Sequence, residues 1–153
     1  MIRFVLICSL CLLCSFKTSN KNIDLDYIRN NYEKSVTEKE ICEMMIKALE
    51  QIKLNDVTLA YLGALQIIWA NHTINPLTKL STFKKGKTNI DKALKNEKDN
   101  IEIRFIRLSV QKNCPQFLGY NKNILEDERY LREHVEKVQS ENLKKMINNI
   151  LNK

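Results

Sequence analysis

Glycine and proline are scarce in this chain of 153 residues, which contains three glycines and two prolines. Short strands joined by tight turns need these residues often, so the shortage argues against a β-sandwich or a β-barrel. Hydrophobic residues make up 44% of the chain, which is enough to form the core of one domain. The chain is too short to form two domains that each have a full core. We therefore expect a single all-α domain built from long helices.

The sequence also lacks recognisable catalytic and metal-binding motifs. Its two histidines, His72 and His134, occur neither in an HExxH motif nor at a cysteine–histidine spacing typical of zinc. It contains no GxSxG motif, no phosphate-binding glycine loop and no evident set of nucleophile, base and orienting residue. We expect no cofactor and no metal. An enzyme stays an alternative, because catalytic groups can lie far apart in a sequence.

One long apolar run is present, at the N-terminus. Arg3 supplies a positive charge, and residues 5–16 are uncharged and precede the polar stretch KTSNKN. This layout is typical of a secretory signal peptide, and the run is shorter than the roughly 20 apolar residues of a membrane-spanning helix. We predict a signal peptide helix at residues 1–17, a single α-helical domain at residues 18–153, and no stable membrane span after cleavage.

Two other interpretations of this segment stay open. Lipid attachment would use Cys8, Cys11 or Cys14, but isoleucine or leucine precedes each of them where a bacterial lipoprotein has a small residue. The segment would otherwise be a retained anchor or a core helix. The pattern favours export, and we expect the mature protein in the periplasm.

Cleavage of the signal would leave two of the five cysteines, Cys42 and Cys114. An even number of cysteines in an oxidising compartment permits a disulfide between them. The alternative, which their apolar neighbours favour, is two separately buried thiols that act as small hydrophobic side chains. Residues 18–153 contain no CxxC motif, which argues against thiol redox chemistry.

The formal charge of +7 has its main source in one stretch of the chain. The lysines of this stretch are Lys79, Lys84, Lys85, Lys87, Lys92, Lys95 and Lys98. The one aromatic residue among them, Phe83, is expected to point inward, so the stretch lacks side chains that stack on bases and we expect no nucleic-acid partner. A solvated helix face is the simplest interpretation, and an acidic protein or an anionic envelope surface is the partner such a patch would suit.

Caps and apolar periodicity divide the remaining chain into helices. We expect them over residues 25–35, 37–54, 57–71, from 76 to before 100 (as one helix or as two broken near Gly86), 101–113, from Asn121 or Asn123 to 138, and 140–151. The expected caps are Asp24, a capping box of Thr37 with Glu40, Asp56, Asn75, Asn100, Asn121 or Asn123, and Ser140. The apolar side chains of these helices are expected to face inward, among them Tyr27, Met44, Leu77, Leu80 and Leu125, and Phe117 in the connection at 114–121 is expected to pack back onto the core. The helix at 57–71 is apolar on almost every side, which predicts a central position.

Residues 101–113 allow two interpretations. Ile101, Ile103 and Phe105 alternate as in a strand, but the alternation changes phase after Phe105. In a helix, the polar residues fall instead on one narrow stripe. These are Asn100, Arg104, Arg107 and Gln111. Because only the helix accounts for every position, we predict a helix.

Arg104 and Arg107 are the strongest candidates for a binding site. Two arginines one turn apart on a buried helix are costly unless each finds a carboxylate or a ligand. The candidate partner-binding residues are Arg104, Arg107, Gln111 and Tyr120, which would line a groove for an acidic peptide. The alternative, which we favour, is internal pairing with carboxylates of the fold. Candidates for that pairing are Glu102, Glu126 and Asp127.

The helix starts are spaced by about twenty residues, as in helical hairpin repeats such as TPR or HEAT. Three segments, AYLGAL at 60–65, NPLTKL at 75–80 and IRFIRLSVQKNCPQFLGY at 103–120, resemble a group of short exported helical proteins from Gram-negative bacteria of the Bacteroidetes kind. The resemblance implies architecture and compartment only. We expect antiparallel helical hairpins, stacked as in TPR proteins or a short α-solenoid, or arranged as an orthogonal bundle.

The sequence as a whole predicts a non-catalytic, exported interaction or structural module that binds a protein or peptide partner in the cell envelope. The alternatives are a small enzyme with an unrecognised site and a carrier of an apolar ligand, the latter suggested by the apolar central helix. A concave groove would favour partner binding, and a closed apolar cavity of hundreds of Å³ would favour a carrier.

Overall fold

The computed structural model describes residues 24–153 and contains helices but no strand in that range. The seven α-helices are α1 (Leu25–Asn31), α2 (Lys39–Leu49), α3 (Asp56–His72), α4 (Pro76–Asn96), α5 (Ile101–Asn113), α6 (Ile124–His134) and α7 (Glu141–Leu151). Three single turns of 3-10 helix join them: η1 (Lys34–Val36), η2 (Gln116–Leu118) and η3 (Val135–Lys137). The all-α prediction is confirmed, and residues 101–113 form a helix.

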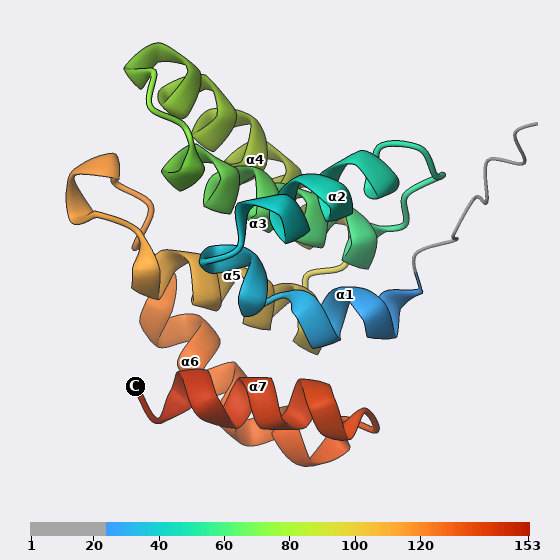
Figure 1. The fold of residues 1–153 in the computed structure, drawn as a ribbon. Helices are drawn as coiled ribbons and strands as arrows, with labels where there is room; N and C mark the ends of the chain where they lie inside the picture. The colour runs from blue at the N-terminus through green and yellow to red at the C-terminus, as the bar shows by residue number, and fades with distance from the viewer. Residues whose placement is uncertain (1–23) are drawn as a thin grey trace, which may run out of the picture.

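The helices pack as a bundle of hairpin-like pairs around α3 and α5. Figure 1 shows α5 between α2, α3 and α4 on one side and α6 and α7 on the other. α3 contacts α2, α4 and α5, and Tyr61, Ala64 and Leu65 on it are fully buried. Neighbouring helices therefore cover α3 on several sides, which agrees with the central position predicted from its apolar sequence.

α3 and α4 form an antiparallel hairpin whose backbones approach closely where two glycines meet. A Cβ atom on Gly63 would lie 2.6 Å from the carbonyl oxygen of Gly86. A Cβ atom on Gly86 would in turn clash with the carbonyl oxygen of Gly63. α4 continues without a break through Gly86, so of the two alternatives for this stretch the single helix is the one observed.

Most predicted caps are present. Side-chain oxygens of Asp24, Asn75, Asn100 and Ser140 accept hydrogen bonds from backbone amides at the starts of α1, α4, α5 and α7. α3 is capped by Asn55 rather than Asp56, because Asn55 and Thr58 form a reciprocal capping box. The cap predicted at Asn121 or Asn123 is wrong, since Asn123 holds the N-cap position of α6 but makes no side-chain cap.

The capping box predicted at Thr37 and Glu40 is wrong. Glu38 holds the N-cap position of α2 and makes no side-chain cap. The Thr37 hydroxyl donates instead to the carbonyl oxygen of Lys34, 3.3 Å away. The predicted first helix is also divided: α1 ends at Asn31 and η1 follows, so the chain turns before α2 begins.

Six apolar side chains that are predicted to face inward are exposed. Five lie on helices and one, Phe117, in the connection after α5. The five on helices are Tyr27, Met44, Leu77, Leu80 and Leu125. The pattern gave the correct face for their neighbours, such as Phe83 and Leu131, which are buried. No helix within residues 24–153 is long and apolar enough to cross a membrane, and the signal peptide predicted at residues 1–17 lies outside the described residues.

Candidate functional site

Arg104 and Arg107 of α5 are held by one buried carboxylate. Asp127 of α6 is 0% exposed, and its Oδ1 and Oδ2 accept hydrogen bonds from Arg107 NH2 and Nε, both at 2.7 Å. Arg104 NH1 donates to Asp127 Oδ1 at 3.0 Å. The two-pronged contact of Arg107 is the geometry in which a guanidinium binds a carboxylate most strongly. The internal pairing considered above is thus present in the fold.

Further contacts use the remaining donors of Arg104. Its Nε donates to the carbonyl oxygen of Lys98 at 2.7 Å, and its NH1 also donates to Glu126 at 2.9 Å. Its guanidinium lies 4.3 Å from the centre of the Tyr130 ring. The hydrogen bond from Arg104 lowers the pKa of the Glu126 carboxyl. Arg104 therefore joins α5 to α6 and has its charge balanced within the fold.

The other two candidate residues, Tyr120 and Gln111, form no hydrogen bond with Arg104, Arg107 or Asp127. The Tyr120 hydroxyl donates to Asp91 of α4 at 2.9 Å, and burial raises the pKa of that hydroxyl. Gln111 is buried, and neither its amide nitrogen nor its amide oxygen has a hydrogen-bond partner among the described residues. None of Arg104, Arg107, Gln111 and Tyr120 is among the residues that line the depression or the groove described below.

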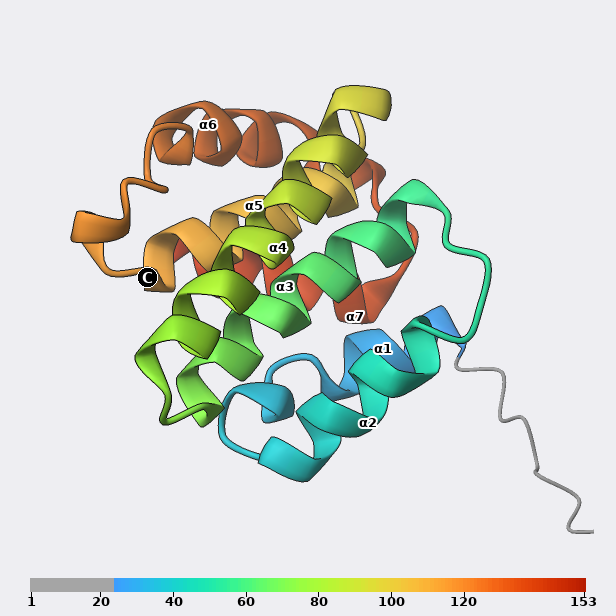
Figure 2. The ribbon, with the colours of Figure 1, turned by 90° about the horizontal axis from the view of Figure 1, so that it is seen from above.

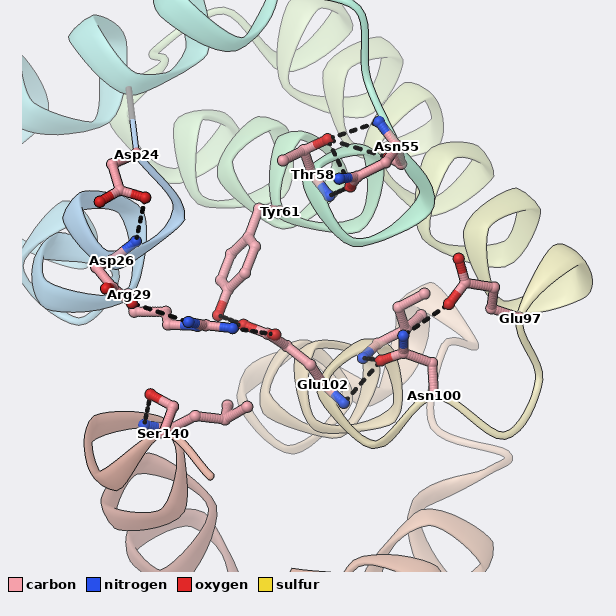
Figure 3. Close-up of polar contacts among 12 residues, drawn as sticks. Asp24, Asp26, Arg29, Asn55, Thr58, Tyr61, Glu97, Asn100, Glu102 and Ser140 are labelled. Atoms are coloured by element: carbon pink, nitrogen blue, oxygen red, sulfur yellow. Dashed lines mark hydrogen bonds and ion pairs between the residues drawn. The ribbon is translucent and has the colours of Figure 1, made fainter. Parts of the chain in front are cut away.

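A second network of buried charge joins α1, α3 and α5. Figure 3 shows Arg29 of α1 and Tyr61 of α3 both pointing at Glu102 of α5. Arg29 contacts both carboxylate oxygens at 2.8 and 2.7 Å, and the Tyr61 hydroxyl donates to Glu102 Oε1 at 2.8 Å. The open depression beside it, about 680 Å³, is bordered by Asp26, Arg29 and Glu102. The charged groups of Arg29 and Glu102 bind each other, so we interpret this network as a structural connection between α1, α3 and α5.

A second concave feature, larger than the depression beside Glu102, is an apolar groove of about 1020 Å³. Its walls come from η1, the C-terminal half of α3, the N-terminal half of α4, α5, η2 and α7. The apolar side chains that line it are Tyr32, Val36, Ile67, Ile68, Leu80, Phe83, Phe105, Val110, Phe117, Leu118, Met146 and Ile150. Figures 1 and 2 agree in placing the α3–α4 turn, η2 and the C-terminus at the same end of the molecule, where this groove lies.

Buried side chains form the floor of the groove and exposed ones its rim. Ile68 and Phe105 on the floor are almost fully buried, whereas Phe117 on the rim is 86% exposed and Leu80 is 42% exposed. Apolar side chains exposed together around a concavity mark interaction surfaces more often than ordinary protein surface. Lys79, Lys153 and Glu33 are the charged residues among those that line the groove.

Sequence reasoning missed this groove because it assigned the rim residues to the core. Leu80 lies at an apolar position of its helical pattern, and Phe117 lies in an apolar connection that was expected to pack onto the core. Neither signal shows whether another element covers the side chain. One signal was available: Pro115 and Gly119 limit η2 to a single turn, which leaves Phe117 on a short projecting segment. Gly119 has a φ of 64°, the left-handed conformation that glycine adopts most easily.

Cys42 and Cys114 are both free thiols in the structure. Cys42 is buried, and its thiol donates to the carbonyl oxygen of Leu65 at 3.4 Å. Burial raises the pKa of the Cys42 thiol to about 12. Burial also raises the pKa of the Cys114 thiol, which lines the groove and is partly exposed.

We predict that Cys114 reacts with a thiol reagent in the native protein at least about tenfold faster than Cys42. The physical reason is that the thiolate is the reactive form, and a buried thiol with a raised pKa forms little of it. Mass spectrometry of peptides after timed alkylation measures the two sites separately. A peptide in which Cys42 is linked to Cys114, or equal rates at both, would contradict this prediction.

Within residues 24–153, no group of three or more histidine, cysteine, aspartate or glutamate side chains is placed to hold a metal ion. Comparison of the chain with protein-family models, with curated proteins and with solved structures finds no match. The resemblance to short exported bacterial proteins stays a prediction.

Proposed function

We propose that this protein is a non-catalytic binding module, and that its groove takes an apolar segment of a protein or peptide partner. The observation that carries the proposal is the groove of about 1020 Å³ with a buried apolar floor and an exposed apolar rim. Burial of such a rim by a partner would release water from apolar surface, which is the main favourable contribution to association.

The proposed binding site does not include the arginines. Arg104 and Arg107 are bound to Asp127, so a partner that used them would first have to break those contacts. The groove side chains need no such change, because Phe117 and Val36 already face solvent. We therefore assign Arg104 and Arg107 to the joint between α5 and α6, and assign partner binding to the groove.

A carrier of an apolar small ligand is the second candidate. The groove volume lies at the upper end of the roughly 300–1,000 Å³ of small-molecule sites, and the side chains of its floor are apolar, as an alkyl chain would require. The exposed rim favours the protein or peptide partner, because a carrier gains most by enclosing its ligand.

The broader proposal keeps the compartment and architecture predicted above. The protein would be exported, with the periplasm as its site of action in the cell envelope. Its hairpins would stack in the manner of TPR units, which is supported by the antiparallel α3–α4 pair and by the packing of α5 on α6. An orthogonal bundle is the alternative arrangement.

A photo-crosslinking amino acid at position 117 tests the groove proposal in the producing cells. The matched control is the same amino acid at Leu125, which is 81% exposed and lies outside the groove. We expect an adduct of protein or peptide mass from position 117 and none from position 125. A co-purifying apolar compound of a few hundred daltons would support the carrier instead.

Substitution gives an independent measurement. Phe117→Asp places a charge on the apolar rim and should weaken capture of the crosslinked partner at least about tenfold, while Leu125→Asp should leave it unchanged. Both side chains are exposed, so neither change should lower the melting temperature by more than a few degrees. Equal effects of the two substitutions on capture would overturn the assignment of the groove.

A further inference from the structure

The outer face of α4 is strongly basic. This helix contains six lysines and a single carboxylate, Asp91. Asp91 is already engaged, since it accepts a hydrogen bond from Tyr120 and lies 4.0 Å from Lys87. Lys84, Lys92 and Lys95 are exposed and take part in none of the ion pairs formed within residues 24–153.

These lysines share a face with an exposed leucine. Leu77, Lys84 and Lys95 are separated by seven and eleven residues, close to two and three turns, so they fall along one line of the helix. From Leu77 to Lys95 that line is about 27 Å long. The opposite side of α4 carries the buried Phe83 and Ile90, and Figure 2 shows α4 uncovered on the side turned to the viewer.

The N-terminal end of this face is apolar and projects from the molecule. Leu77 is 80% exposed, and Ile74, in the turn just before α4, is 97% exposed. Neither residue lines the groove, whose α4 wall consists of Pro76, Lys79, Leu80 and Phe83. Attraction of lysines to anionic headgroups and burial of apolar side chains in the interface are the two contributions by which a protein surface binds such a membrane.

We propose that the outer face of α4 binds an anionic lipid bilayer, with Lys84, Lys92 and Lys95 on the headgroups and Ile74 and Leu77 in the interface. This surface goes beyond the groove and uses different side chains of α4. The positive charge of the lysines complements anionic lipid headgroups. The exposed Ile74 and Leu77 favour a lipid bilayer over a nucleic acid, because a nucleic acid backbone offers no apolar region to bury them. The face has no aromatic side chain on which a base would stack.

Vesicle sedimentation tests this inference with the protein as isolated. Vesicles of phosphatidylglycerol and phosphatidylcholine in equal amounts are compared with phosphatidylcholine alone. We expect binding to the anionic vesicles that weakens as salt is raised, because salt screens the lysines. All variants carry the same N-terminus, so any contribution of residues 1–23 cancels when the variants are compared.

The decisive variant is Lys84→Gln/Lys92→Gln/Lys95→Gln. It should weaken binding to anionic vesicles roughly 100-fold, since each lysine near such a surface contributes about 1 kcal/mol and 1.4 kcal/mol is tenfold. The matched control removes the same charge from other exposed lysines by Lys53→Gln/Lys122→Gln/Lys145→Gln, and should change binding less than about threefold. Circular dichroism confirms that both variants fold.

A second pair of variants tests insertion of the apolar tip. Leu77→Ser should weaken binding about tenfold, because it removes one leucine side chain from the interface, whereas Leu125→Ser should not. The inference is overturned by absence of anionic vesicle binding, by equal losses in the two lysine variants, or by equal losses in the two leucine variants. It is also overturned if a labelled single-stranded oligonucleotide binds through these lysines more tightly than the vesicles do.

Discussion

Asp127→Asn is expected to lower the free energy of unfolding by about 3–5 kcal/mol, a large part of the stability of a domain of this size. The carboxylate is fully buried and is shared by Arg104 and Arg107. Its neutralisation leaves the charge of Arg107 with only a weak contact, 3.8 Å from Glu126. Urea unfolding followed by far-UV circular dichroism measures the loss.

Two controls separate a buried charge from a general effect of the acidic pair. Glu126→Gln should cost less than about 1 kcal/mol, because this carboxylate is half exposed and solvent screens its attraction to Arg104. The triple variant Arg104→Met/Arg107→Met/Asp127→Leu should recover much of the stability that Asp127→Asn loses, since apolar side chains can replace a buried ion cluster. If Asp127→Asn and Glu126→Gln cost the same, the central role of Asp127 would be wrong.

The same cluster shows where sequence reasoning succeeds and where it stops. The polar stripe on α5 is a local property of the chain, so it could be recognised, and pairing with nearby carboxylates could be anticipated. The choice of Asp127 as the shared partner depends on how α6 crosses α5, which no local pattern contains. Arg29 and Glu102 pair across 73 positions in the sequence for the same reason, and that pair was missed.

The predictions of helix caps were likewise correct where the signal is local and wrong where it is not. Asn75, Asn100 and Ser140 were predicted as caps correctly because each side chain acts on its own following turn. The capping box at Thr37 failed because η1 ends at that point, and the hydroxyl of Thr37 satisfies the carbonyl of Lys34 in the preceding turn. A capping residue next to the end of another helical turn can therefore bind either a carbonyl of the preceding turn or an amide of the following helix.

The groove was beyond the reach of the sequence for a different reason. Periodicity identifies the apolar face of a helix but gives no information on whether another element covers that face along its whole length. Leu80 and Phe83 lie three residues apart on the same side of α4, yet Phe83 is buried and Leu80 is 42% exposed. Exposure of Leu80 and Phe117 therefore depends on how the helices pack, which is a property of the assembled fold.

Gly63→Ala and Gly86→Ala are each expected to destabilise the fold by about 3 kcal/mol, although alanine is normally the better helix former. In an exposed helix the exchange would stabilise by up to about 1 kcal/mol. Here the new Cβ on Gly63 would lie 2.6 Å from the Gly86 carbonyl oxygen and 3.0 Å from the Ile90 amide nitrogen. Because those atoms belong to the backbone, α3 and α4 would have to separate and lose packing along the hairpin.

The losses of unfolding free energy caused by the two substitutions should also be non-additive. The size of this non-additivity tests directly whether α3 and α4 approach each other at these two glycines. Once one alanine has separated α3 and α4, the second meets less resistance, so the double variant should lose clearly less than the sum of the single losses. Gly119→Ala is the control for glycine replacement, since no atom lies within 4 Å of its Cβ position and only its φ of 64° is strained, at about 1 kcal/mol. Thermal and urea unfolding of the four variants measure these differences. If Gly63→Ala or Gly86→Ala raised the melting temperature, α3 and α4 would not approach as closely as described, and the α4 wall of the groove would have to be placed differently.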